Sequence, residues 1–250
     1  MMISYGLSDK GKFRAENQDA FDICPYGDDT LAVVCDGMGG AAAGRLASDM
    51  AAKQFVTFAR TGFAVGGTEQ DEDVLRQACD SANRQIYHFA STSDEYVGMG
   101  TTLVGAIFRA DTATFVNVGD SRAYRIARDG IVRITKDHSL VQQMVDRGEL
   151  TPEQARRHPR RNIITRAVGS DAFVTCDLYS LAIRPGDIFL LCSDGLTNAV
   201  EEAELHRLAL AADDVESACR AMVDKALENN ARDNITAVVV KTEKGGGERG

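Results

Sequence analysis

No run of apolar residues in this sequence approaches the roughly 20 that a membrane-spanning helix needs. The N-terminal stretch MMISYGLSDKGKFR also lacks the basic-then-apolar pattern of an export signal. These two absences argue against membrane insertion and against secretion. We therefore expect a cytoplasmic protein that makes no membrane contact.

Positive charge is in deficit. The chain has 28 Lys and Arg against 37 Asp and Glu, a net charge of −9. This balance disfavours a broad contact with a phosphate backbone, so we expect no nucleic-acid partner. An acidic excess is compatible with cation binding, although most acidic proteins are simply soluble. The apolar fraction of 44% is ordinary for a soluble globular protein.

The six cysteines show no C-x-x-C spacing, and several of them lie in apolar segments expected to form strands. Buried, reduced thiols in a cytosolic protein are the simplest interpretation. The sequence also contains no internal repeat and no linker that would divide it. We predict one domain over residues 1–242, present as a monomer, and a disordered tail over 243–250.

The hydrophobic periodicity predicts strands first, then two helices, more strands, two more helices and a final strand. The expected helices cover 41–60, 75–89 and two segments within 201–230, and a Gly-containing acidic loop covers 61–73. The expected strands cover 3–8, 20–24, 31–35, 100–108, 112–118, 122–126, 131–135, 173–183, 187–193 and 234–241. This order predicts an α+β fold, a sandwich of antiparallel sheets with helices outside.

Five aspartates stand at the expected ends of strands. Asp36 and Asp194 each follow a strand with no polar side, in the stretches LAVVCDG and IFLLCSDG. Asp120 follows the strand FVNV, Asp233 precedes the last strand, and Asp19 lies at the start of an early one. Taken singly, Asp-Gly and Gly-Asp are common turn dipeptides. Strands without a polar side are buried on both faces, however, so these carboxylates start close to the core.

Several carboxylates near a core are stable together only when cations compensate their charge. Oxygen ligands without convergent His or Cys suit Mg²⁺ or Mn²⁺. We predict that the aspartates converge on two such ions, roughly 3.5–4 Å apart, which activate water for hydrolysis of a phosphate ester. Asp36 would bridge the ions, Gly37 would let its carbonyl approach one, and Gly39 and Gly40 would allow a tight exit from the strand.

An arginine is a natural partner for the phosphoryl oxygens in such a reaction. Arg14 lies five residues before Asp19 and is the candidate. Spacing alone does not distinguish it from an ordinary surface arginine.

The chain contains, in this order, the segments RAENQDAF, VVCDGMGG, GTTL, VGDSRAYRI, DHSLVQQMV, RNIITRAVG, LLCSDGLTN and ARDNITAVVV. Together they resemble the bacterial metal-dependent serine/threonine protein phosphatases of type 2C (the PPM family). The match runs from about Ile3 to Lys241. Each segment alone is a weak signal, whereas eight in sequence are specific.

The resemblance implies two stacked antiparallel sheets flanked by paired helices, with a binuclear Mn²⁺ or Mg²⁺ centre in a cleft at one end. It implies that Asp36 bridges both ions and that the Gly37 carbonyl binds one. Asp194 and Asp233 would hold the other ion.

The resemblance also implies roles for three further residues. Asp19 would act through ordered water, Asp120 would help to form a weaker third metal site, and Arg14 would hold the substrate phosphate. Water would attack phosphorus directly, without a phosphoenzyme. The substrates would be phosphoserine and phosphothreonine in proteins, which implies an opposing Ser/Thr kinase.

The sequence departs from the family at two positions. Animal-type members carry a histidine, proposed as the general acid, where this chain has Met38. Protonation of the leaving group then has no obvious side chain, and we expect a metal-bound water to supply the proton. Asn198 stands where some relatives have another aspartate for the third metal, so that site would be weaker.

Residues 139–165 correspond to the flap beside the catalytic cleft of bacterial members. The flap contains the dense basic stretch RRHPRR, from Arg156 to Arg161. These arginines could contact an acidic or phosphorylated substrate, or they could be a solvated helix end that cations stabilise. Both interpretations stay open at the level of sequence.

Two other functions share most of this pattern. A binding module that kept the fold but lost catalysis should have broken metal ligands, and this chain shows only peripheral changes. A phosphatase for one dedicated regulator or for small molecules would keep the same ligands, and sequence does not exclude it.

Overall fold

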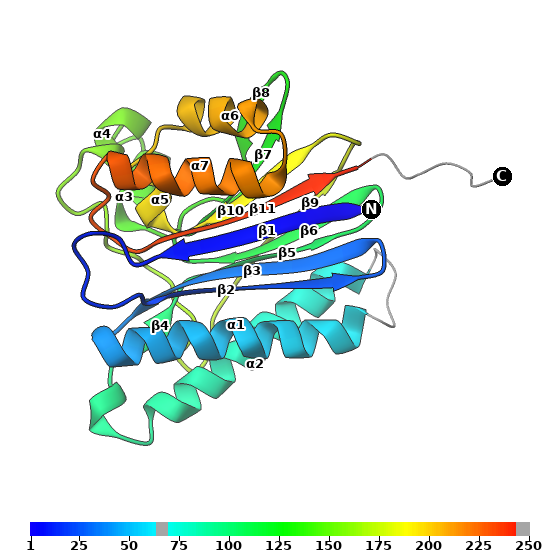
Figure 1. Ribbon diagram of the computed structural model, residues 1–250. Helices are drawn as coiled ribbons and strands as arrows, with labels where there is room; N and C mark the ends of the chain where they lie inside the picture. Colours follow the sequence, from blue (N-terminus) through cyan, green and yellow to red (C-terminus); the bar gives the residue numbers. More distant parts are fainter. Residues whose placement is uncertain (64–69, 244–250) are drawn as a thin grey trace.

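In a computed structural model, residues 1–63 and 70–243 form two antiparallel β-sheets stacked face to face, with helices on both outer sides (Figure 1). The central part of the predicted acidic loop, 64–69, and residues 244–250 of the tail predicted over 243–250 lie outside the described residues.

The first sheet has the strand order β1-β11-β10-β7-β8 and the second has the order β2-β3-β5-β6-β9, with β4 paired to β3. Every pair of neighbouring strands is antiparallel. The first sheet comprises β1 (Met2–Asp9), β7 (Arg122–Ala127), β8 (Gly130–Arg133), β10 (Ile188–Cys192) and β11 (Ile235–Thr242). The second comprises β2 (Asp19–Tyr26), β3 (Asp29–Met38), β4 (Gly100–Thr101), β5 (Leu103–Phe108), β6 (Thr112–Val118) and β9 (Asp177–Ala182). The predicted α+β sandwich is confirmed.

Helices α1 (Ala41–Phe63) and α2 (Asp71–Ala90) pack on the second sheet, and α6 (Glu202–Ala211) and α7 (Val215–Glu228) pack on the first (Figure 1). The remaining helical segments are short: η2 (Asp94–Tyr96), α3 (Leu140–Asp146), α4 (Pro152–Arg156) and α5 (Asp194–Thr197). The flap contains α3 and α4, and α4 begins with a capping box of Thr151 and Gln154. None of the helices within the described ranges is long and apolar enough to cross a bilayer.

Three apolar cores separate the four layers, and strand alternation explains them. Along β3, Leu31, Val33 and Cys35 face the core under α1 and α2, whereas Ala32 and Val34 face the core between the sheets. A third core lies under α6 and α7. The central strands are therefore buried on both faces, as their lack of a polar side predicts. All six cysteines are free thiols.

Several predicted boundaries are wrong, and the predicted loop 61–73 is helical at both ends because α1 runs to Phe63 and α2 begins at Asp71. Strand β3 does not end before Asp36 but continues through it to Met38, because β4 extends the pairing. The expected strand 100–108 is interrupted at Thr102, whose backbone N–H donates to the Asp36 carbonyl instead of continuing the ladder of β5. The expected strand 173–183 begins only at Asp177, and the Asp171 and Ala172 carbonyls shortly before it accept from Asn83 of α2.

Candidate metal centre

The five predicted aspartates share one region at an end of the sandwich. Asp19 and Asp36 are direct partners in the β2–β3 register. Asp120 lies in the turn between β6 and β7, Asp194 begins α5, and Asp233 lies two residues before β11. The negative charges of the other four all raise the pKa of Asp36. The predicted convergence of carboxylates distant in sequence is therefore present.

Asp19 and Asp120 are buried and Asp36 and Asp194 are partly buried, and none of these four forms an ion pair within the described residues. Burial, followed by repulsion from neighbouring carboxylates, raises the pKa of Asp36 and of Asp120 well above the ordinary value for aspartate. Burial also raises the pKa of Asp194 to about 6 and that of Asp19 to about 7. At Asp19, hydrogen bonds from two hydroxyl groups partly offset the effect of burial on the pKa. Such a cluster costs folding free energy and favours any cation that can enter it.

Two carboxylate oxygens in the cluster are buried and have no hydrogen-bond donor among the described residues: Asp19 Oδ1 and Asp194 Oδ1. The second oxygen of each group is satisfied. Asp19 Oδ2 accepts from Ser193 Oγ and Thr236 Oγ1, both at 2.7 Å. Asp194 Oδ2 accepts from Asn198 Nδ2 at 2.9 Å. Buried oxygens left open in an all-carboxylate site fit Mg²⁺, Mn²⁺ or their coordinated water.

The cluster is not yet closed around an ion. Within the two described ranges, no three His, Cys, Asp or Glu side chains already stand at metal-binding distances from one point. Asp233 is instead paired with Arg14, whose Nη2 donates to Asp233 Oδ2 at 2.6 Å. The structure thus places Arg14 beside the cluster, and ion binding requires local side-chain movement.

Position 37 requires glycine in this structure because neighbouring backbone atoms leave no room for a side chain. A Cβ on Gly37 would lie 1.9 Å from the Gly44 carbonyl oxygen of α1 and 2.7 Å from that of Gln18. The clearance therefore serves packing of β3 against α1, and ligation by the Gly37 carbonyl stays a prediction. The expected tight exit is confirmed, since Gly39 and Gly40 have φ of 112° and 92°.

Two threonines to which no sequence pattern pointed fix the position of Asp36. Its backbone N–H donates to Thr102 Oγ1 at 2.9 Å, and its carbonyl accepts from Thr102 N and Thr101 Oγ1, each at 2.8 Å. The GTTL segment contains both of them, but nothing in its spacing revealed this contact.

Asn234 was also missed, although it directly follows Asp233. Its Nδ2 donates to the Glu16 carbonyl at 2.9 Å, and its Oδ1 accepts from Gln18 N at 2.8 Å. These bonds fix the loop that carries Arg14 next to Asp233. The pair is therefore positioned by backbone contacts as well as by its own charges.

Comparison with known proteins gives a consistent result. Residues 13–238 match the model of the family described as protein phosphatase 2C. The serine/threonine phosphatase Stp of Listeria innocua is 35% identical over 235 residues, which cover 94% of this chain and 93% of that protein. The chain belongs to the protein phosphatase 2C family. Its members are phosphoprotein phosphatases, and this chain is a serine/threonine phosphatase of the bacterial type.

Solved structures of this family share the fold over nearly the whole chain. The serine/threonine phosphatase Stp1 of Staphylococcus aureus superposes with a TM-score of 0.90 at 38% identity, covering 98% of this chain and 96% of Stp1. The catalytic domain of the phosphatase PstP, in a complex with two manganese ions, superposes with a TM-score of 0.85 at 31% identity, covering 97% of this chain and 99% of that domain.

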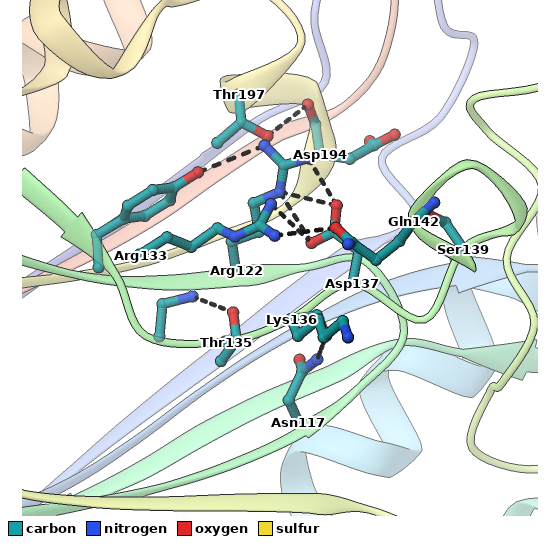
Figure 2. A network of polar contacts seen from close by, with 12 residues as sticks. Asn117, Arg122, Arg133, Thr135, Lys136, Asp137, Ser139, Gln142, Asp194 and Thr197 are labelled. Carbon is teal, nitrogen blue, oxygen red and sulfur yellow. Dashed lines mark hydrogen bonds and ion pairs between the residues drawn. The ribbon is translucent and has the colours of Figure 1, made fainter. Parts of the chain in front are cut away.

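Beside the cluster, this phosphatase has one buried carboxylate that is fully compensated. Asp137 accepts from Arg122 Nε at 3.0 Å and Nη2 at 2.7 Å, and Arg133 Nη1 lies 3.5 Å from its other side (Figure 2). Arg133 Nη2 also donates to Gln142 Oε1 of α3 at 3.1 Å. This network links β7 and β8 to the flap.

A cavity of about 960 Å³ lies between the flap and the body of the phosphatase. Asp120 and Asp194 line it, and so do Arg157 and Arg161 of the flap. Arg156, in the last turn of α4, forms an ion pair with Glu201. Because Arg156 lines the cavity together with Arg157 and Arg161, both interpretations of the basic stretch stay open.

Proposed function

We propose that this phosphatase depends on two Mn²⁺ or Mg²⁺ ions held by its aspartate cluster, and that it hydrolyses phosphoserine and phosphothreonine in proteins without a phosphoenzyme. The supporting observation is the buried cluster itself, with its raised pKa values and two carboxylate oxygens that no described residue satisfies. The two manganese ions in the PstP complex support the same proposal. When bound, the ions would supply activated water for direct attack on phosphorus.

The proposed ligands differ in how the fold holds them. Asp36, the most enclosed by other carboxylates, would lie between the two ions. Asp194 and Asp233 would complete one site, and Asp19 would turn its open Oδ1 toward an ion-bound water. The Gly37 carbonyl would bind an ion after a small local movement.

A weaker third site is proposed at Asp120 and Asp194. The Asn198 amide nitrogen already donates to Asp194 Oδ2, so this side chain presents a donor where a ligand oxygen would be needed. The negative charge of an aspartate is also absent at this position. We expect a third ion to bind only at high metal concentration.

Arg14 is proposed to bind the substrate phosphate. Its contact with Asp233 is one hydrogen bond on a side chain that is 48% exposed, so the planar guanidinium can turn toward a bidentate anion. Arg157 and Arg161 are placed to attract acidic groups of a protein substrate into the cavity. Met38 offers no proton for the leaving oxygen, so we assign proton donation to the solvent within the site.

The biological setting is proposed from the chemistry. A phosphatase for phosphoserine and phosphothreonine requires a Ser/Thr kinase that makes its substrates, and six free thiols suit the reducing cytoplasm. We propose that the enzyme opposes such a kinase there as a monomer. Light scattering after size exclusion checks the monomer.

The decisive experiment measures phosphate release from phosphothreonine peptides by the full-length protein. We expect activity with Mn²⁺, loss with EDTA and recovery when Mn²⁺ is restored. Calorimetry with Mn²⁺ alone should show tight binding without substrate. Activity indifferent to EDTA would refute the metal mechanism, and tight Mn²⁺ binding without turnover would identify a binding module. A preference for small phosphate esters would argue against protein substrates.

A further inference from the structure

Two cysteines lie in the core between α2 and the second sheet. Cys79 lies on α2 and is fully buried, whereas Cys176 directly precedes β9 and is partly exposed. Cys176 packs against the core that contains Cys79, and each thiol lies close enough to shift the pKa of the other. Two cysteines 97 positions apart in sequence are thus neighbours in this core.

The chain on either side of this contact is firmly held. Asn83, one turn after Cys79, is buried, and its Oδ1 accepts from Gly169 N at 2.7 Å. Its Nδ2 donates to the Asp171 carbonyl at 3.0 Å. The segment leading to Cys176 is therefore fixed to the same helix that carries Cys79. A covalent bond between the sulfur atoms would join parts that are already packed together.

The two thiols have different chemical environments. The neighbouring Cys79 side chain is the main cause that lowers the pKa of Cys176, and the positive charge of Arg76 acts in the same direction. The neighbouring Cys176 side chain, together with burial, raises the pKa of Cys79. Cys176 is thus the more accessible thiol, and Cys79 lies buried behind it.

We propose that Cys79 and Cys176 form a dithiol site that hydrogen peroxide oxidises reversibly to a disulfide. The Cys176 thiolate attacks one peroxide oxygen, which breaks the O–O bond, yields a sulfenic acid and releases one water after protonation. The Cys79 sulfur then attacks the Cys176 sulfur, loses its proton and displaces the second water. Two electrons pass from the thiols to peroxide, and a cellular dithiol reverses the change by exchange.

The position of this site connects it with the aspartate cluster. Val168, in the segment that Asn83 holds, pairs with Thr101 through hydrogen bonds of 2.8 and 3.0 Å. Thr101 Oγ1 donates to the Asp36 carbonyl at 2.8 Å. The proposed disulfide would therefore attach to a segment that is hydrogen-bonded to the support of Asp36. The proposal itself does not depend on the proposed metal mechanism.

Peptide mapping of the intact protein tests the proposal. The reduced protein is treated with hydrogen peroxide, its remaining thiols are alkylated, and it is digested with trypsin plus an Asp-specific protease for mass spectrometry. We expect a Cys79–Cys176 link that dithiothreitol reverses. Cys24→Ser is the matched control, because Cys24 is the other partly exposed cysteine packed on the same core, and it should leave the link unchanged.

A second measurement tests the proposed order of the steps, in which Cys176 is oxidised first and Cys79 then forms the disulfide. In Cys79→Ser the sulfenic acid on Cys176 has no resolving thiol, so a dimedone adduct should accumulate at least several-fold above wild type. A thermal melt under reducing conditions checks that each variant is folded. A link between Cys79 and any other cysteine, such as Cys35, or equal dimedone labelling of wild type and Cys79→Ser, would overturn the proposal.

Discussion

Two groups of buried carboxylates lie at the same end of this phosphatase, and the fold treats them in opposite ways. Asp137 is compensated by Arg122 and Arg133, with hydrogen bonds of 2.7 to 3.2 Å from Arg122 (Figure 2). The cluster around Asp36 has raised pKa values and open oxygens instead. Arg14 offers it one hydrogen bond from a partly exposed position.

This difference would separate a structural carboxylate from the proposed metal ligands. The fold is able to supply arginines to a buried aspartate, since it does so for Asp137. It leaves the cluster uncompensated at a cost in free energy, which a metal-dependent reaction would explain. Each prediction below alters one side of this comparison.

The largest effect is expected from Asp36→Asn. Loss of the proposed bridging charge should lower phosphatase activity by about 10³-fold, comparable with removal of a central electrostatic group in other enzymes. The metal-free variant should be at least as stable as wild type, because one of several repelling carboxylates is gone. Phosphate release and thermal melting with EDTA measure the two effects.

The matched control for this variant is Asp129→Asn, in the exposed turn between β7 and β8. It should change neither activity nor melting temperature. If Asp36→Asn kept near-normal activity, or if it lost stability without metal, the contrast with Asp137 would be wrong.

Unlike Asp36→Asn, Asp137→Asn should lower the stability of the fold. It removes the charge between Arg122 and Arg133, whose side chains are 17% and 27% exposed, so it should destabilise the fold by about 3 kcal/mol. Urea denaturation measures the loss. The neighbouring Lys136–Asp146 pair is exposed, and Asp146→Asn should cost less than about 1 kcal/mol. Equal losses for the two variants would contradict the structural role of Asp137.

Thr236→Val tests the hydroxyl groups that orient Asp19. Thr236 Oγ1 and Ser193 Oγ both donate to Asp19 Oδ2, which leaves Oδ1 open toward the site. Valine keeps the shape but removes one donor, so Mn²⁺ affinity should fall roughly 10- to 100-fold. Calorimetry measures this without substrate. Thr236→Ser, which restores the hydroxyl, should recover the affinity, and failure to do so would point to packing instead.

The sequence predicted the carboxylates better than the contacts that hold them. Asp36 and Asp194 were found because an acid after a fully apolar strand is unusual. Arg122, Asp137 and Asn234 were missed because their roles depend on loops that meet only in the folded chain. Local patterns carry periodicity and strand ends, but they carry no information about which polar side chains from different segments become partners.

The stability of the metal-free protein should fall as pH rises. In the folded state the pKa is about 7 for Asp19 and about 6 for Asp194, above the roughly 3.9 of unfolded aspartate. The folded state therefore binds more protons, and this contribution is fully present below about pH 4 and lost as pH rises through 6 and 7. Melting curves with EDTA from pH 5 to 8 should show the decline.

Two comparisons sharpen this pH prediction. Mn²⁺ binds ionised carboxylates, so its stabilising effect should grow over the same pH range. Asp19→Asn should flatten the metal-free decline because one titrating group is removed. A decline as steep in this variant as in wild type would assign the pH dependence to other groups.

Arg14→Lys should have the smallest effect on stability and still change function. The Arg14–Asp233 pair is partly exposed, so its loss should change the free energy of unfolding by less than about 1 kcal/mol. Lysine keeps the charge but loses the planar fork that binds two phosphate oxygens, so KM for a phosphopeptide should rise several-fold. Mn²⁺ affinity should stay near wild type. A marked fall in Mn²⁺ affinity with unchanged KM would show that Arg14 supports Asp233, as Arg122 supports Asp137, and does not bind the substrate.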